Sequence, residues 1–108
     1  MSESKILGLL GMAAKAGKLA SGEFAAEQAL KARKAWLTIV ADDASANTKK
    51  KFRDRCGYVS CPILVIGSKQ TISHAIGKDE RSCIAVLDQG LAAAISRAAE
   101  TITDNRGE

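Results

Sequence analysis

The chain has 108 residues, of which 46% are hydrophobic, so it is long enough for one ordinary globular domain with a core of its own. Its formal net charge is +4 at pH 7, a moderate excess that permits binding to polyanions without requiring it. No apolar run approaches the roughly 20 residues needed to cross a bilayer, and the N-terminus lacks a secretory signal pattern. We therefore expect a single domain over residues 1–108 of a cytoplasmic protein that does not enter a membrane.

The first predicted elements are a helix and a very short strand. Apolar residues recur at helical spacing from Ser4 to Ala16. Gly17 is placed to end this helix in a left-handed conformation. A strand from Lys18 to Ala20 is expected to follow, and it leads into the helix around which the rest of the chain is arranged.

The second helix occupies the stretch that ends at Lys34, and its two long sides differ. Ser21 is the expected N-cap and Gly22 the first helical residue, so the first amide groups point outward and can hold a phosphate. The packing side consists of Ala26, Ala29, Leu30 and Arg33, and the polar side of Phe24, Gln28, Lys31 and, less centrally, Glu27 and Lys34. The polar side is either a solvated surface with Phe24 turned inward or a surface that binds nucleic acid.

Strands and helices alternate along the rest of the chain. Compact β-branched and apolar runs predict buried strands at Trp36–Ala41, Pro62–Ile66 and Cys83–Leu87. Helices are expected from the cap Ser45 through Cys56 with Gly57 as the stop, from Lys69 to Ile76 between Ser68 and Gly77, and along the stripe Leu91, Ile95, Ala98 and Ile102. This alternation predicts an α/β fold with helices on both faces of one sheet.

Few residues offer catalytic or metal-binding chemistry. His74 is the only histidine, and it lies off the apolar stripe of its helix, so we expect it to face solvent. Cys56 and Cys61 are separated by four residues, which is wider than the usual zinc spacing, and a second ligand pair is missing. We expect these two residues and Cys83 to be buried thiols, and we predict no catalytic residue, metal, cofactor or small-molecule substrate.

Basic residues gather in one segment, from Lys49 to Arg55. This segment holds five basic residues and one acidic residue, a net charge of +4, which equals the net charge of the whole chain. On a helix these charges spread around the cylinder, so the segment is either a solvated surface or a second basic helix that contacts a phosphate backbone.

Four short motifs then carry a family resemblance. They are Lys18-Leu-Ala-Ser-Gly-Glu23, Asp42-Asp-Ala-Ser-Ala-Asn-Thr-Lys-Lys-Lys51, Ile76-Gly-Lys78 and Asp88-Gln-Gly90. In this order and spacing, the chain resembles the ribosomal and RNA-processing proteins of the L-seven-A-e and L-thirty-e type, which bind kink-turn RNA, and most of all their bacterial YlxQ-like branch. The likeness covers about Lys5 to Ile102. It implies a three-layer α/β/α sandwich with a four-stranded mixed sheet, and a non-enzymatic RNA-binding protein that is associated with the ribosome.

The resemblance also implies where RNA is held. In the family, the N-terminal end of the second helix docks into the widened groove at tandem sheared G·A pairs, and the loop before the last strand holds an extruded nucleotide. Carried over by position, the groove contacts are Lys18, Ser21, Gly22, Glu23, Phe24, Gln28 and Lys31, and the loop is Gly77 to Ser82, with Gly77, Lys78 and Arg81 as its expected contacts. This agrees with the preference of proteins for distorted, non-helical RNA.

Phe24 and Ala25 depart from the family pattern. They stand where archaeal and eukaryotic members place a polar pair that hydrogen-bonds purine edges, which neither side chain can do. The chain therefore either reads a kink-turn through its backbone, Glu23 and flanking bases, or binds another RNA or a protein. We predict that Phe24 is at least partly exposed and stacks on a base.

Two other functions compete with RNA binding. One is a protein-interaction module on the same fold, with Leu19 and Phe24 in an exposed apolar patch. The other is a binding subunit related to RNA methyltransferases, which the absence of a cofactor motif makes the weakest of the three.

Overall fold

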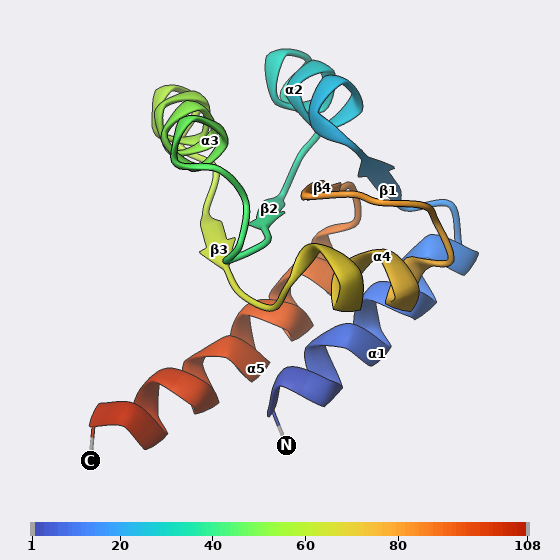
Figure 1. Cartoon of the computed structure of the whole chain (residues 1–108), viewed down its shortest axis with the longest axis vertical. Helices are drawn as coiled ribbons and strands as arrows, with labels where there is room; N and C mark the ends of the chain where they lie inside the picture. Colours follow the sequence, from blue (N-terminus) through green and yellow to red (C-terminus); the bar gives the residue numbers. More distant parts are fainter. Residues whose placement is uncertain (1, 108) are drawn as a thin grey trace.

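A computed structural model describes the backbone of residues 2–107 and the side chains of residues 3–100. Five helices and four strands alternate along this part of the chain (Figure 1). The helices are α1 (Ser2–Lys15), α2 (Glu23–Lys31), α3 (Ala46–Tyr58), α4 (Lys69–Ile76) and α5 (Gln89–Gly107). The strands are β1 (Leu19–Ser21), β2 (Leu37–Val40), β3 (Ile63–Val65) and β4 (Cys83–Val86).

The strands form one mixed sheet between two layers of helices. Their order is β1-β4-β2-β3, with β2 and β3 parallel and the other two pairs antiparallel. Helices α2 and α3 cover one face, and α1, α4 and α5 cover the other (Figure 1). The predicted three-layer α/β/α sandwich with a four-stranded mixed sheet is therefore confirmed. No helix in the part of the chain that the structure describes is long and apolar enough to cross a membrane.

The core lies around the two central strands. Every residue of β2 and β4 is buried, because helices cover both faces of the sheet there and a neighbouring strand lies on each side. The prediction of a buried strand from Pro62 to Ile66 is correct only in part. Strand β3 is shorter and half-buried because it lies at an edge of the sheet.

The start of α2 differs from the prediction. Ser21 is not the N-cap; it is the last residue of β1 and pairs with Ile84 of β4. The N-cap is Gly22, whose φ of 99° and ψ of 157° fall in a region that suits glycine, and the helix begins at Glu23. The prediction was wrong because pairing with β4 holds Ser21 extended, a long-range contact that a local capping pattern does not contain.

The other helix ends follow the predictions except at the C-terminus of α2 and at Gly57. Helix α2 ends at Lys31, so Lys34 lies beyond it, and Arg33, predicted on the packing side, is exposed in the following turn with a φ of 56°. Ser45 and Ser68 cap α3 and α4, and Gly17 and Gly77 adopt the left-handed conformation after α1 and α4. Gly57 does not stop α3, which continues through Tyr58, and the chain turns at Ser60, with a φ of 58°. Along α5 the buried residues are Ala92, Ile95 and Ala98, with Leu91 half-buried; the side chain of Ile102 lies outside the described side chains.

Candidate nucleic-acid interface

Antiparallel pairing of β1 with β4 brings together the two segments predicted to bind RNA. Ser21 at the end of β1 lies opposite Ile84 near the start of β4, and the Gly22 N–H donates to the Cys83 carbonyl at 2.8 Å. Helix α2 follows β1 directly, and the loop of residues 77–82 directly precedes β4. The N-terminus of α2 and this loop are therefore neighbours in space although they are far apart in the sequence.

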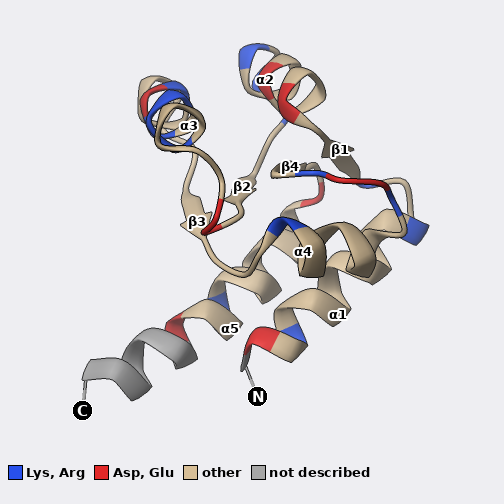
Figure 2. Ribbon diagram, viewed as in Figure 1, with Lys and Arg blue, Asp and Glu red and all other residues tan. Residues whose placement is uncertain are grey.

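An open hollow of about 510 Å³ lies between these two segments. It is lined by Ser21, Gly22, Glu23, Phe24 and Ala25 on one side and by Glu80, Arg81 and Ser82 on the other. The loop carries both charges, because Lys78 and Arg81 flank two acidic residues (Figure 2). Five of the predicted contacts line this hollow, namely Ser21, Gly22, Glu23, Phe24 and Arg81. Ala25, Glu80 and Ser82 line it as well.

The N-terminus of α2 opens onto the hollow without a side-chain cap. Gly22 has no side chain to accept from the first amides of the helix, and no side-chain cap hydrogen bond is formed there. Uncapped amides at a helix N-terminus carry partial positive charge and can donate to an anion or a base. The loss of Ser21 as a cap therefore leaves these donors more available than the sequence predicts.

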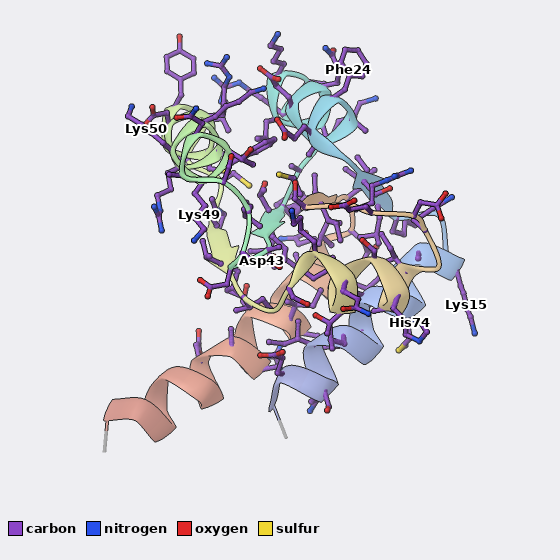
Figure 3. The ribbon with its side chains drawn as sticks, viewed as in Figure 1. Lys15, Phe24, Asp43, Lys49, Lys50 and His74 are labelled. Carbon is purple, nitrogen blue, oxygen red and sulfur yellow. The ribbon has the colours of Figure 1, made fainter. Side chains whose placement is uncertain are left out.

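Phe24 projects from the first turn of α2. Its side chain points away from the sheet (Figure 3), and 76% of its surface is exposed. The prediction that Phe24 is at least partly exposed is confirmed, and the inward orientation is excluded. Gln28 and Lys31 lie one and two turns further along the same side of the helix and are also exposed.

Arg81 packs against the turn at Gly22. A Cβ atom at Gly22 would lie 3.6 Å from Arg81 Cδ and 3.7 Å from Arg81 Nε. The Nη1 group donates to the carbonyls of Asp79 and Glu80, both at 3.3 Å. The Nε group is buried and has no hydrogen-bond partner. An unpaired buried donor costs free energy, which an acceptor on a ligand would recover.

The remaining predicted contacts do not line the hollow. Lys18 is exposed just before β1. Gly77 and Lys78 lie at the far end of the loop, where they line a separate hollow of about 400 Å³ together with residues of α1 and α4. The structure thus divides the predicted contacts into residues that line one hollow and residues that lie outside it.

The basic segment of α3 is paired with α2. Lys51 Nζ and Arg55 Nε each lie 3.0 Å from the Glu27 carboxylate. Lys51 also lies 3.7 Å from Glu23, which accepts a hydrogen bond of 3.2 Å from the Thr48 hydroxyl. Hydrogen bonds from Lys51 and then Arg55 lower the pKa of Glu27, and the bond with Glu27 raises the pKa of Lys51. We call these residues, Glu23, Glu27, Thr48, Lys51 and Arg55, the α2–α3 bridge.

Two more basic residues of the segment form ion pairs, one with a residue of α3 and one with a residue that follows β2. Lys50 lies 3.0 Å from Asp54 and Lys49 lies 3.8 Å from Asp42. Acidic and basic residues accordingly occur together on α2 and α3 (Figure 2). These pairs favour the solvated surface over the second basic helix that binds phosphate.

The described residues hold no group of three or more His, Cys, Asp and Glu side chains suited to a metal ion. Cys56, Cys61 and Cys83 are free and buried, as the sequence predicts. Burial raises the pKa of the Cys83 thiol to about 11, and a hydrogen bond with Cys61 raises that of Cys56. His74 is exposed on α4, as predicted (Figure 3).

The three-layer sandwich, with the uncapped N-terminus of its second helix beside the loop of residues 77–82, is the arrangement that the family resemblance implies. Comparison with known proteins leads to the same family. The profile of the ribosomal protein L7Ae/L30e/S12e/Gadd45 family matches residues 4–96. The chain belongs to this family.

Two similar relatives carry the same name. RNA-binding protein YlxQ of Bacillus subtilis (strain 168) is 38% identical over 92 residues, which cover 85% of this chain and 92% of the relative. RNA-binding protein YlxQ of Enterococcus faecium is 37% identical over 91 residues, which cover 84% and 87%. The resemblance to the YlxQ-like branch is therefore confirmed.

Solved structures share the fold. A Bacillus halodurans protein described as having unknown function superposes with a TM-score of 0.86 at 38% identity, covering 89% of this chain and 97% of that one. The Giardia lamblia 15.5kD RNA binding protein superposes with a TM-score of 0.81 at 22% identity, covering 93% and 88%.

Proposed function

We propose that this chain is a non-enzymatic protein that binds structured RNA, and that it docks the N-terminus of α2 on a kink-turn or a similarly distorted site. The main support is the hollow between α2 and the loop of residues 77–82, which combines uncapped amides, an exposed aromatic ring and an arginine. Each of these groups suits one part of an unpaired nucleotide. Regular RNA duplexes do not present their bases to such a hollow, whereas distorted sites do.

Each side of the hollow has its own part in the proposal. The first amides of α2 donate to a phosphate or to a base edge. Phe24 stacks on a base, which needs no hydrogen bond and tolerates any sequence. Arg81, from the loop, donates to an acceptor on an extruded nucleotide.

Glu23 has a different part from that of a simple base contact. Its carboxylate accepts from Thr48 and lies 3.7 Å from Lys51, so the side chain is already engaged with α3. Because Phe24 and Ala25 cannot hydrogen-bond purine edges, the backbone amides and Phe24 would supply most of the recognition. We therefore propose recognition of RNA shape, with less dependence on base identity than a polar pair would give.

The relatives support the class of ligand. Two of them, at 38% and 37% identity, are named RNA-binding proteins. Since the family takes its name from ribosomal proteins, we propose ribosomal RNA as the first target to test.

The test is a titration of the protein with a fluorescent kink-turn RNA and with a duplex of the same length and composition. We expect the kink-turn to bind at least tenfold more tightly at the same salt concentration. Equal affinities would contradict docking on a distorted site, and no binding to either RNA would favour the protein-interaction alternative.

A further inference from the structure

We infer that Ser73, on α4, is a positioning residue for RNA binding, because it fixes the backbone of Arg81 at the rim of the hollow. This inference rests on the proposed function. Ser73 belongs to neither of the segments predicted to contact RNA, and it does not line the hollow between them. Its carbonyl also accepts from the Lys78 N–H at 3.0 Å, a bond that a change of the side chain leaves in place, so the effect of the hydroxyl would pass through Arg81.

Ser73 is bonded to both main-chain groups of Arg81. The Arg81 N–H donates to Ser73 Oγ at 2.6 Å, and Ser73 Oγ donates to the Arg81 carbonyl at 3.2 Å. Only 6% of the Ser73 surface is exposed, so water competes little for these bonds. A buried hydroxyl is satisfied here by one residue of an otherwise exposed loop.

The helix that carries Ser73 is firmly placed. Ile72 and Ile76 of α4 are buried in the core beside it. A capping box of Ser68 and Thr71 begins the helix, and Gly77 ends it in the left-handed conformation. Ser73 therefore connects α4, on one face of the sheet, to the loop of residues 77–82, which lies beside α2 of the other face (Figure 1).

The side chain of Arg81 depends on this attachment. Its two hydrogen bonds, both from Nη1 at 3.3 Å, end on carbonyls of the same loop, so they cannot fix the guanidinium relative to α2. Nε, beside Gly22, has no partner. The pair of bonds to Ser73 is the link that ties residue 81 to the core from the α4 side, and it determines where the guanidinium meets the RNA.

The test is a double-mutant cycle with Ser73→Ala, Arg81→Ala and the double variant, titrated with the fluorescent kink-turn RNA. We expect Ser73→Ala alone to weaken binding about fivefold to tenfold. In the Arg81→Ala background it should weaken binding less than twofold, because its only route to the RNA is gone. Ser73→Cys keeps a side chain of similar shape that donates only weakly. Its affinity for the RNA should lie between those of wild type and Ser73→Ala.

Ser68→Ala is the matched control, since Ser68 caps the same helix and its hydroxyl is bonded to Thr71. It should lower the melting temperature and leave RNA affinity unchanged. Equal affinity losses from Ser68→Ala and Ser73→Ala would overturn the inference, and so would losses from Ser73→Ala and Arg81→Ala that simply add.

Amide hydrogen exchange provides a readout without RNA. In the free protein, Ser73→Ala should speed the exchange of the Arg81 amide at least tenfold, and Ser68→Ala should speed it less. An unchanged Arg81 amide would refute the positioning of the loop. Faster exchange together with failure of the wild-type chain to prefer the kink-turn would instead overturn the proposed function.

Discussion

Phe24 is a residue at which we expect this chain to depart from the hydrogen-bonding pattern of the family. It lies in the first turn of α2, and 76% of its surface is exposed. In the free protein this apolar surface is in contact with water, which is unfavourable. When the ring stacks on a base, part of this surface is removed from water, and that burial favours binding. At this position the chain has an aromatic side chain, which can stack on a base but cannot hydrogen-bond to one.

We predict that Phe24→Ala weakens binding to kink-turn RNA and leaves the fold intact. Stacking contributes about 1 to 3 kcal/mol per base, so the loss of affinity should be at least fivefold. The melting temperature should change little, because exposed substitutions usually stay within about 0.5 kcal/mol. Calorimetry and a fluorescence titration on the same sample measure both effects.

Tyr58 provides the matched control for Phe24. It is also aromatic, is 86% exposed and lies in the last turn of α3, outside the hollow. Tyr58→Ala should leave RNA affinity unchanged. If Phe24→Ala lowers stability and the folded fraction still binds normally, the stacking role is wrong.

At the scale of elements, local patterns predict the helices and the central strands well. Helical spacing of apolar residues and the caps Ser45, Ser68 and Gly77 need only neighbours within one or two turns, and the structure contains them as predicted. The features that local patterns do not predict are those that depend on the order of the strands in the sheet. The pairing of β1 with β4 turns Ser21 from a cap into a strand residue and creates the hollow, and no short-range signal encodes that pairing.

The α2–α3 bridge could have been predicted in part. Glu23 and Glu27 are four residues apart, as are Lys51 and Arg55, so each helix presents one stripe of charge opposite in sign to the other. The missing information was that the two helices are neighbours on one face of the sheet. Ser73 gave no signal, because a serine within a helix is ordinarily exposed or bonded to its own helix.

We predict that Glu27→Gln destabilises the protein at neutral pH by about 0.5 to 1 kcal/mol, because it removes the carboxylate that Lys51 and Arg55 share. The pKa of Glu27 is lower in the folded than in the unfolded chain, so this stabilisation is present above the ordinary value of 4.5 and is lost as pH falls through the folded value. Urea denaturation of both proteins at pH 7 and below pH 4 should therefore show a difference that shrinks in acid.

Asp54→Asn is the comparison for Glu27→Gln. It removes one exposed ion pair within α3, between Lys50 and Asp54, and should cost less stability. A difference between wild type and Glu27→Gln that stays constant or grows in acid would show that the bridge does not stabilise the fold through its charge.

At the scale of the whole molecule, the charge of +4 on the segment from Lys49 to Arg55 overstates the basic surface available on α3. Lys49, Lys50, Lys51 and Arg55 all lie within 4 Å of a carboxylate. The basic residues that we expect to contact RNA are few, namely Lys18, Lys31, Lys78 and Arg81. Several other basic residues are paired with carboxylates of the protein itself, so we expect only a small part of the positive charge to meet RNA.

This division predicts the salt dependence of RNA binding. Each phosphate contact lowers the slope of log affinity against log salt by roughly 0.7 to 0.9, so contacts from those four residues give a slope of about −3. Lys31→Ala should make the slope shallower by roughly 0.7 to 0.9, and Lys50→Ala, on α3, should leave it unchanged. Titrations with kink-turn RNA at several salt concentrations measure all three slopes. A flat response would argue against phosphate contacts altogether. A slope steeper than about −6 that becomes shallower in Lys50→Ala would place RNA on α3. There the RNA phosphates would have to displace the carboxylates that pair with the basic residues of α3.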